Sequence, residues 1–252
     1  MPLVSPDLPA DTDLLCEGCG YRLNGLPPAS NCPECGRPIL SSTQNTGRSL
    51  PPWESAPKLT SALYLSTAAA IVLRPKSFFA QLITRHSPAR SHAFATISRA
   101  FAALLMAVAT SIHFSWCVAP TFYPPAIIGQ LNELSLNVLH IILLWPLVWG
   151  SLTATSWAAT RLTAFESKYH GLRLPLPVVS RLMNFHTACY LPVSLAAIAY
   201  IATTRSLIGL TILDPSFILN YLYILCSFVI LAAAYLFWSY WIAMKNSMYA
   251  NV

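Results

Sequence analysis

The chain has 252 residues, of which 55% are hydrophobic and only 10% are charged, and its formal net charge is +6. Ordinary soluble domains carry about 25% charged residues, so this balance excludes a soluble fold for the main body and indicates a membrane protein. The chain opens with Met1-Pro2 and a polar tail that holds three aspartates. No cleavable signal peptide is therefore expected, and the first membrane helix would serve as the insertion signal.

After the polar tail at residues 1–13, the segment 14–40 contains two Cys-x-x-Cys pairs separated by twelve residues. Four thiolates at this spacing are typical of a closed tetrahedral zinc site, which has no open position for a substrate and is therefore structural. A glycine follows each pair, at Gly20 and Gly36, where the chain must turn tightly behind the second sulfur. The predicted metal ligands are Cys16, Cys19, Cys32 and Cys35.

The same segment is too short to bury a self-sufficient core, so metal binding would supply its folding energy. Asn24-Gly25 between the pairs predicts a hairpin turn. Two disulfides are the alternative pairing of the four cysteines. The zinc interpretation implies a reducing compartment and hence a cytosolic N-terminus. Two arginines balance two glutamates in this zinc ribbon, so nucleic acid is not an expected partner.

Residues 41–57 are rich in Ser, Pro and Gly and predict a flexible linker that tethers the ribbon. Residues 58–95 predict basic helices at the membrane interface. The apolar run 59–73 is shorter than the roughly 20 residues that a spanning helix needs, which favours an interfacial or re-entrant helix. A second surface helix is expected after Pro75, with apolar residues at helical spacing on one face. These are Phe78, Phe79, Leu82 and Ile83.

No acidic residue occurs between Glu54 and Glu133, although six basic residues do. Such a stretch favours an anionic lipid leaflet, with a gain of about 1 kcal/mol for each basic residue near the surface. Ordinary flanking charge that marks the cytosolic side explains the pattern equally well. The residues expected at the lipid surface are Lys58, Arg74, Lys76, Arg85 and Arg90.

Residues 96–245 predict a membrane bundle with four spans. The expected spans are 96–117, 135–158, 184–204 and 217–243. With the N-terminus inside, 14 of the 15 Lys and Arg residues lie on the cytosolic side, which predicts that both termini are cytosolic. The expected fold is thus an all-α membrane protein, a bundle of four spans, or five if 59–73 crosses, with a small N-terminal cytosolic zinc ribbon.

Small residues form one stripe on each of the first two spans, which predicts that these helices meet as an antiparallel pair along the stripes. The first stripe is Ala103, Ala107 and Ser111, and the second is Gly150, Ala154 and Ala158.

The string CxxCGYxLxGL…CPECG, as it stands in residues 16–36, resembles the N-terminal zinc-ribbon module fused to many membrane proteins of planctomycete-type bacteria. The apolar helix followed by LRPKSFFAQL and the later loop YHGLRLPLPVVSRLMNFHTACYLP resemble the Yip family of small multi-spanning membrane proteins. The second resemblance implies a role in membrane organisation or trafficking, usually five spans and a cytosolic N-terminus, and it brings no catalytic residues. A bacterial inner (cytoplasmic) membrane is the expected location.

Catalytic signatures such as HExxH, GxSxG or a P-loop do not occur in the sequence. The expected spans also contain no Asp or Glu, which argues against cation-coupled transport. His113 and His140 are expected at matching depth near the outer surface, with Cys117 close by, and this trio is a candidate site for a metal, a haem or a quinone. Ordinary core or interfacial histidines are the alternative.

We therefore expect a non-enzymatic membrane-organising or adaptor protein with a structural zinc ion, whose ribbon binds a cytosolic protein and whose basic stretch contacts lipid. The alternatives are a small-solute transporter or channel, and a membrane redox or metal protein that uses His113 and His140.

Overall fold

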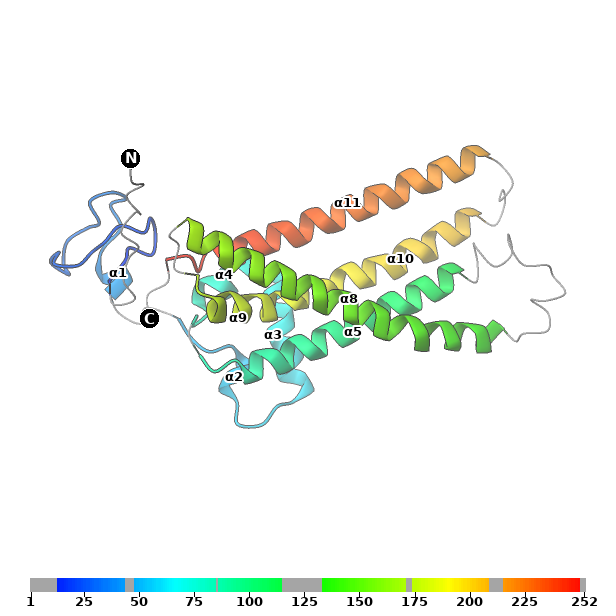
Figure 1. Ribbon diagram of the computed structural model, residues 1–252, viewed down its shortest axis with the longest axis horizontal. Coiled ribbons are helices and arrows are strands. Elements are labelled where there is room, and N and C mark those ends of the chain that lie inside the picture. Colours follow the sequence, from blue (N-terminus) through cyan, green and yellow to red (C-terminus); the bar gives the residue numbers. More distant parts are fainter. Residues whose placement is uncertain are drawn as a thin grey trace. The chain divides into compact units, whose positions relative to one another are not determined.

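The computed structural model describes residues 13–43, 48–84, 86–114, 133–170, 174–208 and 215–249 (Figure 1). Regular secondary structure within these residues is entirely helical. The helices are α1 (Leu40–Thr43), α2 (Pro52–Ser55), α3 (Ser61–Leu73), α4 (Pro75–Gln81), α5 (Ala89–His113), α8 (Glu133–Tyr169), α9 (Leu176–His186), the 3₁₀ turn η2 (Thr187–Cys189), α10 (Tyr190–Ile208) and α11 (Pro215–Lys245).

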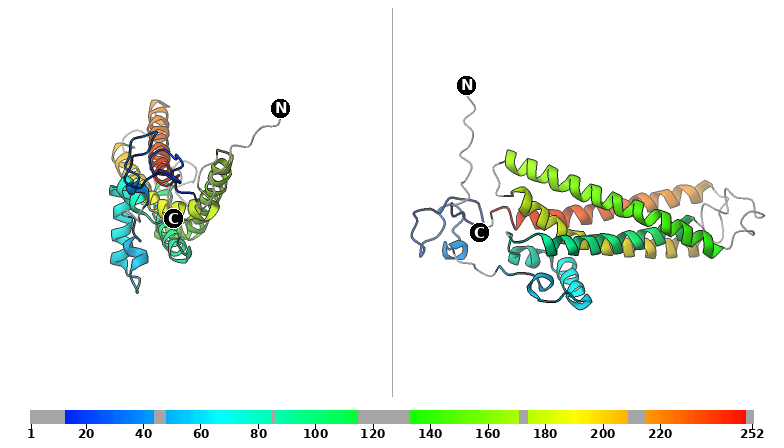
Figure 2. Two further views of the ribbon diagram at one scale, coloured as in Figure 1. Left: turned by 90° about the vertical axis from the view of Figure 1, so that its left-hand side faces the viewer. Right: turned by 60° about the horizontal axis from the view of Figure 1, so that its bottom comes forward.

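Four of these helical segments, which Figure 2 shows from two further sides, are long and apolar enough to cross a membrane, which confirms the all-helical class and the expected number of spanning-length helices. They are Ala89–His113, Asn137–Tyr169, Leu176–Thr203 and Tyr223–Lys245. The apolar run 59–73 forms α3, whose 13 residues reach about 20 Å at 1.5 Å per residue. Because a hydrocarbon core is about 30 Å thick, α3 is too short to add a fifth span in a straight crossing.

The chain divides into two compact units that each draw on separated segments. The first unit comprises Met1–Phe94, Trp157–His186 and Ser239–Val252, and the second comprises Ala95–Ser156 and Thr187–Trp238. The ribbon, the expected linker and the expected interfacial helices thus belong to the same unit, together with one end of α8 and of α11. The sequence had predicted a ribbon held only by a tether.

The second unit is built from neighbouring helix pairs. Helices α5 and α8 run antiparallel, because Trp145 Nε1 donates to the carbonyl of Ala100 at 3.0 Å and Ser111 Oγ donates to that of Asn137 at 3.1 Å. The hydroxyls of Ser156 on α8 and Tyr190 on α10 are 3.0 Å apart. Helix α10 in turn meets α11 where the Tyr200 and Phe228 rings stack with centroids 5.5 Å apart.

The two small-residue stripes do not meet as predicted. Ala103 and Ala107 are fully buried, but Gly150 is exposed and a Cβ built on it would meet no atom within 4 Å. The register set by the α5–α8 hydrogen bonds explains the difference, because it places Gly150 about one to two turns beyond the residues opposite Ala103. The antiparallel pairing was right and the depth was wrong.

The corner between α3 and α4 follows from a single proline. Thr60 caps α3, accepting a hydrogen bond from the Leu63 N–H at 3.3 Å, and Arg74 ends it by donating its backbone N–H to Ala70. Pro75 cannot continue the α3 hydrogen-bond pattern, but its fixed φ suits the first position of a new helix, so α4 begins there. Figure 1 shows α3 running across α9 rather than alongside it.

The stretch predicted to be a flexible linker is ordered where the structure describes it. It contains α2, whose Trp53 and Glu54 are both buried. The Trp53 backbone N–H donates to Thr67 Oγ1 at 3.1 Å, and its indole N–H donates to the carbonyl of Arg90 at 2.8 Å. A Ser- and Pro-rich composition predicted mobility, but Trp53 fixes this segment to α3 and α5, and the Glu54 carboxylate fixes it to α9.

Aromatic rings form the core of the first unit. The Trp53 ring meets the Tyr64 and Phe94 rings with centroids 6.0 Å away in each case, and Phe94 lies 5.3 Å from Phe185 of α9. Phe79 is fully buried as well. Such ring pairs stabilise a core beyond their buried area by about 0.5 to 1.5 kcal/mol each. Phe79, and the equally buried Leu82, therefore face protein, although the sequence placed them on a membrane surface.

Candidate metal centre

The four predicted cysteine ligands converge on one point. Their Sγ atoms all lie within 4.8 Å of one another, with 3.5 Å between those of Cys16 and Cys35 and 3.6 Å between those of Cys19 and Cys32. A tetrahedral zinc–thiolate centre with bonds of 2.3 Å has sulfur atoms about 3.8 Å apart, so this donor set fits a metal ion of that size. All four cysteines are free, and these separations far exceed the roughly 2.05 Å of a disulfide.

Two similar knuckles position the sulfur atoms. In the first, the Gly20 N–H donates to the carbonyl of Cys16 at 2.8 Å, and in the second the Gly36 N–H donates to that of Cys32 at 2.9 Å. Both glycines have positive φ, 82° and 71°, which residues with a Cβ rarely adopt. The glycines that the sequence singled out thus have the conformation expected of them.

The turn between the knuckles also forms where the sequence predicted it. Gly25 has φ of 80°, and the Leu26 N–H donates to the carbonyl of Leu23 at 3.1 Å. Asn24 fastens the turn to the start of the ribbon by accepting from the Leu14 N–H at 2.7 Å. Leu23 and Ile39 form a small apolar cluster with Cys16 and Cys32, which are more buried than the other two cysteines.

The environment makes the four thiols unequal. Burial raises the pKa of the Cys16 and Cys19 thiols, which favours their protonated forms in the absence of an ion. The backbone N–H of Cys35 instead lowers the pKa of Cys32 to about 7, because it stabilises the thiolate. Metal binding requires thiolates, so an ion bound by the four cysteines would displace the protons of Cys16 and Cys19.

Arg48 ties the ribbon to two other parts of the first unit. Its Nε lies 3.3 Å from Glu17 Oε1 of the first knuckle, its Nη1 donates to the carbonyl of Leu82 at 2.9 Å, and its Nη2 donates to that of Asn246 at 3.2 Å. Three separated segments therefore meet at one guanidinium. Sequence reasoning missed this contact because nothing local distinguishes Arg48 from other arginines.

The residues after α11 add a second contact with the ribbon. A Cβ built on Gly20 would lie 2.6 Å from the Tyr249 ring, so the tyrosine packs directly against the knuckle glycine. Gly20 is thus needed for its positive φ and for the room it leaves to the tyrosine. At Gly36, by contrast, a Cβ would meet no atom within 4 Å.

The predicted lipid-contact residues have different surroundings. Lys58, Arg74 and Lys76 are exposed. Arg90 instead donates through Nη1 to the backbone carbonyls of Glu54 and Ala56, so its side chain supports the fold of the first unit. Arg85 lies outside the described residues.

The structure describes only two of the three residues of the candidate outer-surface site, His113 and His140. Cys117 lies outside the described residues, and the Phe114 ring meets the His140 ring edge-on with centroids 4.4 Å apart. His113 is at the end of α5. Within the part of the chain that the structure describes, the ribbon cysteines are the only group of three or more possible metal ligands.

A buried polar pair that the sequence did not predict links α2 to α9. Arg181, only 1% exposed, donates to both carboxylate oxygens of Glu54, which is 4% exposed, and its Nε donates to the carbonyl of Ile83 at 2.9 Å. The available signal was Arg181 itself, because an arginine among Val178, Val179 and Leu182 on an amphipathic helix requires a buried carboxylate partner.

A second polar group lies further along the same helix. Nε2 of His186 is 2.9 Å from Ser239 Oγ of α11, and the Asn184 amide donates to Ser91 Oγ of α5 at 3.2 Å. The hydroxyls of Thr163 and Tyr240 are 2.6 Å apart. All three contacts are internal to the first unit: the His186 and Asn184 contacts hold α9 against α11 and α5, and the Thr163–Tyr240 contact joins α8 to α11.

Comparisons with protein-family models, with curated proteins and with solved structures find no match for this chain.

Proposed function

We propose that the chain is a non-enzymatic integral membrane protein with four spans that acts as an adaptor, and that its zinc ribbon binds a cytosolic protein. The observation that carries the proposal is the four-cysteine centre, because four thiolates fill a tetrahedral ion and leave no position for chemistry. Zinc is the ion proposed, and its role is to fold the ribbon.

Attachment of the ribbon supports this adaptor role. Arg48 and Tyr249 hold the ribbon to segments of its own unit, among them the residues that directly follow α11, so a protein bound to the ribbon would be linked to a spanning helix through ordered contacts as well as through the chain. Tyr21 and Leu40 are exposed apolar residues on or next to the ribbon, 37% and 45% accessible, and they offer a contact surface.

The membrane setting of the proposal rests on charge. With the N-terminus in the cytosol of a bacterium, 14 of 15 basic residues are cytosolic, and the exposed Lys58, Arg74 and Lys76 lie where they can approach an anionic inner-membrane leaflet. The resemblances to planctomycete-type zinc ribbons and to the Yip family agree with such a role and remain part of the proposal.

Site-specific photo-crosslinking in living cells tests the adaptor function. A photoreactive residue in place of Tyr21 should capture one protein of defined mass, and the same residue in place of Leu65 on α3 is the matched exposed control. The Tyr21 product should disappear when Cys16 and Cys19 are changed to serine, because the ribbon surface then no longer forms. A product that survives loss of the metal site, or equal capture from both positions, would refute the proposal.

A further inference from the structure

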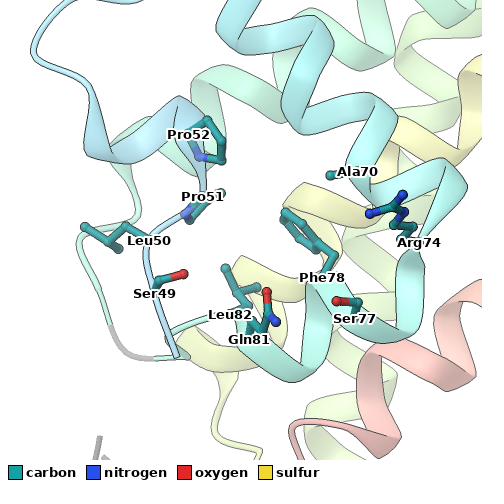
Figure 3. Close-up of a pocket in the computed structure, with 10 residues that line it drawn as sticks. All are labelled: Ser49, Leu50, Pro51, Pro52, Ala70, Arg74, Ser77, Phe78, Gln81 and Leu82. Atoms are coloured by element: carbon teal, nitrogen blue, oxygen red, sulfur yellow. The ribbon is translucent and has the colours of Figure 1, made fainter. Parts of the chain in front are cut away.

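A pocket of about 250 Å³ lies in the first unit, beside the corner between α3 and α4 (Figure 3). One wall is the extended segment 49–51 with Pro52 at the start of α2, and the opposite wall is Ala70 and Arg74. Phe78 and Leu82 of the α4 region lie between them. The pocket is open to the surface, and its size suits a lipid headgroup with a few attached carbons rather than a whole lipid.

The walls are held together by the backbone. The Ser49 N–H donates to the carbonyl of Gln81 at 2.6 Å, and the Ile83 N–H donates to that of Ser49 at 3.4 Å, forming a bridge between Ser49 and Leu82. Proline at positions 51 and 52 further restricts the first wall. The pocket is therefore preformed, and a ligand would not have to order the segments around it.

The polar groups that line the pocket are suited to an anion. Figure 3 shows the Arg74 guanidinium on one side of the pocket, with Ser77 on the same side, Gln81 beside Leu82 and Ser49 on the opposite wall. Arg74 uses its backbone N–H to end α3, and within the described part of the chain its guanidinium makes no hydrogen bond or ion pair. No acidic residue is among the described residues that line the pocket, and none occurs between Glu54 and Glu133 in the sequence.

Apolar groups line the rest of the pocket, which favours a ligand that carries apolar carbon as well as an anionic group. Phe78, Leu82, Leu50 and Pro51 offer carbon surface next to the guanidinium. A planar guanidinium binds phosphate oxygens with two parallel hydrogen bonds, and hydroxyl or amide donors can satisfy the remaining oxygens. The combination fits a phosphate group joined to apolar carbon.

The neighbouring surface of α3 indicates where such a ligand would come from. Leu65 and Leu73 of α3 are 62% and 76% exposed, and Leu73 directly precedes Arg74. A short apolar helix with exposed leucines beside an unpaired cation is suited to the boundary between headgroups and acyl chains.

We propose that this pocket binds the phosphate headgroup of a single anionic membrane lipid. Arg74 pairs with the phosphate, Ser77 and Gln81 donate to its other oxygens, and the first carbons of the lipid lie against Phe78 and Leu82. This inference rests on the proposed membrane setting of the chain and adds to it a discrete site. The other source of the same chemistry is free phosphate or a soluble phosphate ester.

Lipid titration of the full chain in detergent, followed by native mass spectrometry, tests the site. The wild-type chain should bind the first phosphatidylglycerol at least tenfold more tightly than the first phosphatidylcholine. Arg74→Gln should reduce this preference about tenfold, since it removes the paired charge. Lys76→Gln is the matched control, because Lys76 is also exposed, lies two residues away and is not among the residues that line the pocket. It should keep the preference.

Each other outcome has a definite meaning. Equal losses in both variants would mean a diffuse attraction to the anionic surface, which refutes the pocket and leaves the membrane proposal standing. If neither the wild-type chain nor any variant preferred phosphatidylglycerol, the pocket as a lipid site and the proposed contact with an anionic leaflet would both be refuted. Displacement of the lipid by millimolar inorganic phosphate or glycerol phosphate would overturn the lipid as ligand. Ala70→Leu, which fills the pocket while keeping Arg74, should reproduce the loss, and an unchanged preference in a folded Ala70→Leu chain would also refute the site.

Discussion

Glu54 and Arg181, which are 127 residues apart in the sequence, form a fully buried two-point ion pair that joins α2 to α9. Burying two charges costs much of what their attraction gains, so the pair need not make the protein more stable than a matched apolar pair would. The pair does restrict α2 to one position, because moving α2 would leave a buried charge without its partner, which is energetically unfavourable.

Breaking this ion pair should destabilise the first unit strongly. We expect Glu54→Gln to lower the free energy of unfolding by about 3 to 5 kcal/mol, because Arg181 would remain buried with no counter-charge. Mixed-micelle denaturation followed by tryptophan fluorescence measures the change. Glu166→Gln, at an exposed position of α8, is the control and should have little effect. The double variant Glu54→Leu, Arg181→Met should regain much of the loss, and similar losses in the double and single variants would contradict this account.

Removing two zinc ligands should unfold the ribbon without preventing membrane insertion. The change of Cys16 and Cys19 to serine leaves two thiolates, too few for a closed structural site, so bound zinc should fall from one ion per chain to none. Elemental analysis of purified protein measures this. Cys226→Ser, an exposed cysteine of α11 outside the cluster, should keep the ion. If the double variant failed to insert into the membrane at all, the two parts would not form independently.

The two knuckle glycines should respond differently to the same substitution. Gly36→Ala should cost roughly 1 to 2 kcal/mol in ribbon stability, the usual cost of a positive φ for a residue with a Cβ. Gly20→Ala should cost more, since its Cβ would also collide with the Tyr249 ring. Hydrogen exchange of the ribbon amides measures both.

Tyr249→Ala provides the check on that difference. Added to Gly20→Ala, it should remove the excess cost and bring the variant close to Gly36→Ala. If Gly20→Ala still lost more stability than Gly36→Ala without the tyrosine, a collision with Tyr249 would not be the cause of the difference.

Substitutions along the two stripes should separate the packed helix face from the open one. Ala107→Leu should destabilise the second unit by about 1 to 3 kcal/mol, because the residue is fully buried against its neighbours. Gly150→Ala should be neutral or slightly stabilising, since its Cβ would enter open space and alanine favours a helix. Thermal unfolding in detergent measures both, and comparable losses would show that α8 packs through Gly150 after all.

Both termini should lie on the cytosolic side. In a chain whose Cys117, Cys189 and Cys226 are changed to serine, the cysteines introduced by Asn45→Cys and Ala250→Cys should resist a membrane-impermeant thiol reagent in intact cells. Thr121→Cys, between the first two expected spans, should react. An even number of spans places both termini on the same side, and the concentration of basic residues on that side identifies it as cytosolic. Labelling of Ala250→Cys but not Asn45→Cys would require an odd number of spans and would make α3 a crossing segment.

Local sequence information was sufficient for the metal centre and for the spans. The ligand cysteines lie within 20 residues, so their spacing already implies a shared ion, and glycine is the residue that tolerates the backbone the knuckles need. Spans are equally local, because length and apolarity decide whether a helix can cross. Proline at position 75 set the boundary of α3 in the same way.

Contacts between distant residues could not be derived from composition. A stretch rich in Ser and Pro indicated a flexible linker, yet the neighbours of Trp53 are Tyr64 and Phe94, and the charge of Glu54 is paired only through α9. The depth at which α5 meets α8 was missed for a related reason. Small residues show where close approach is allowed, whereas hydrogen bonds such as Trp145 to Ala100 decide the register.

The Arg48 contact also gives the chain an order of assembly. Its partner Asn246 lies 198 residues later, so the ribosome completes the ribbon long before it makes the segment against which the ribbon docks. Nascent chains fold from the N-terminus as they emerge, and the ribbon can take up its ion while the spans are still being inserted. Docking through Asn246 and Tyr249 can then occur only after α11 and the residues that follow it have been made. A docked ribbon therefore reports that synthesis has passed residue 249, whereas a chain that stops before residue 246 exposes the bare Gly20 face of its first knuckle.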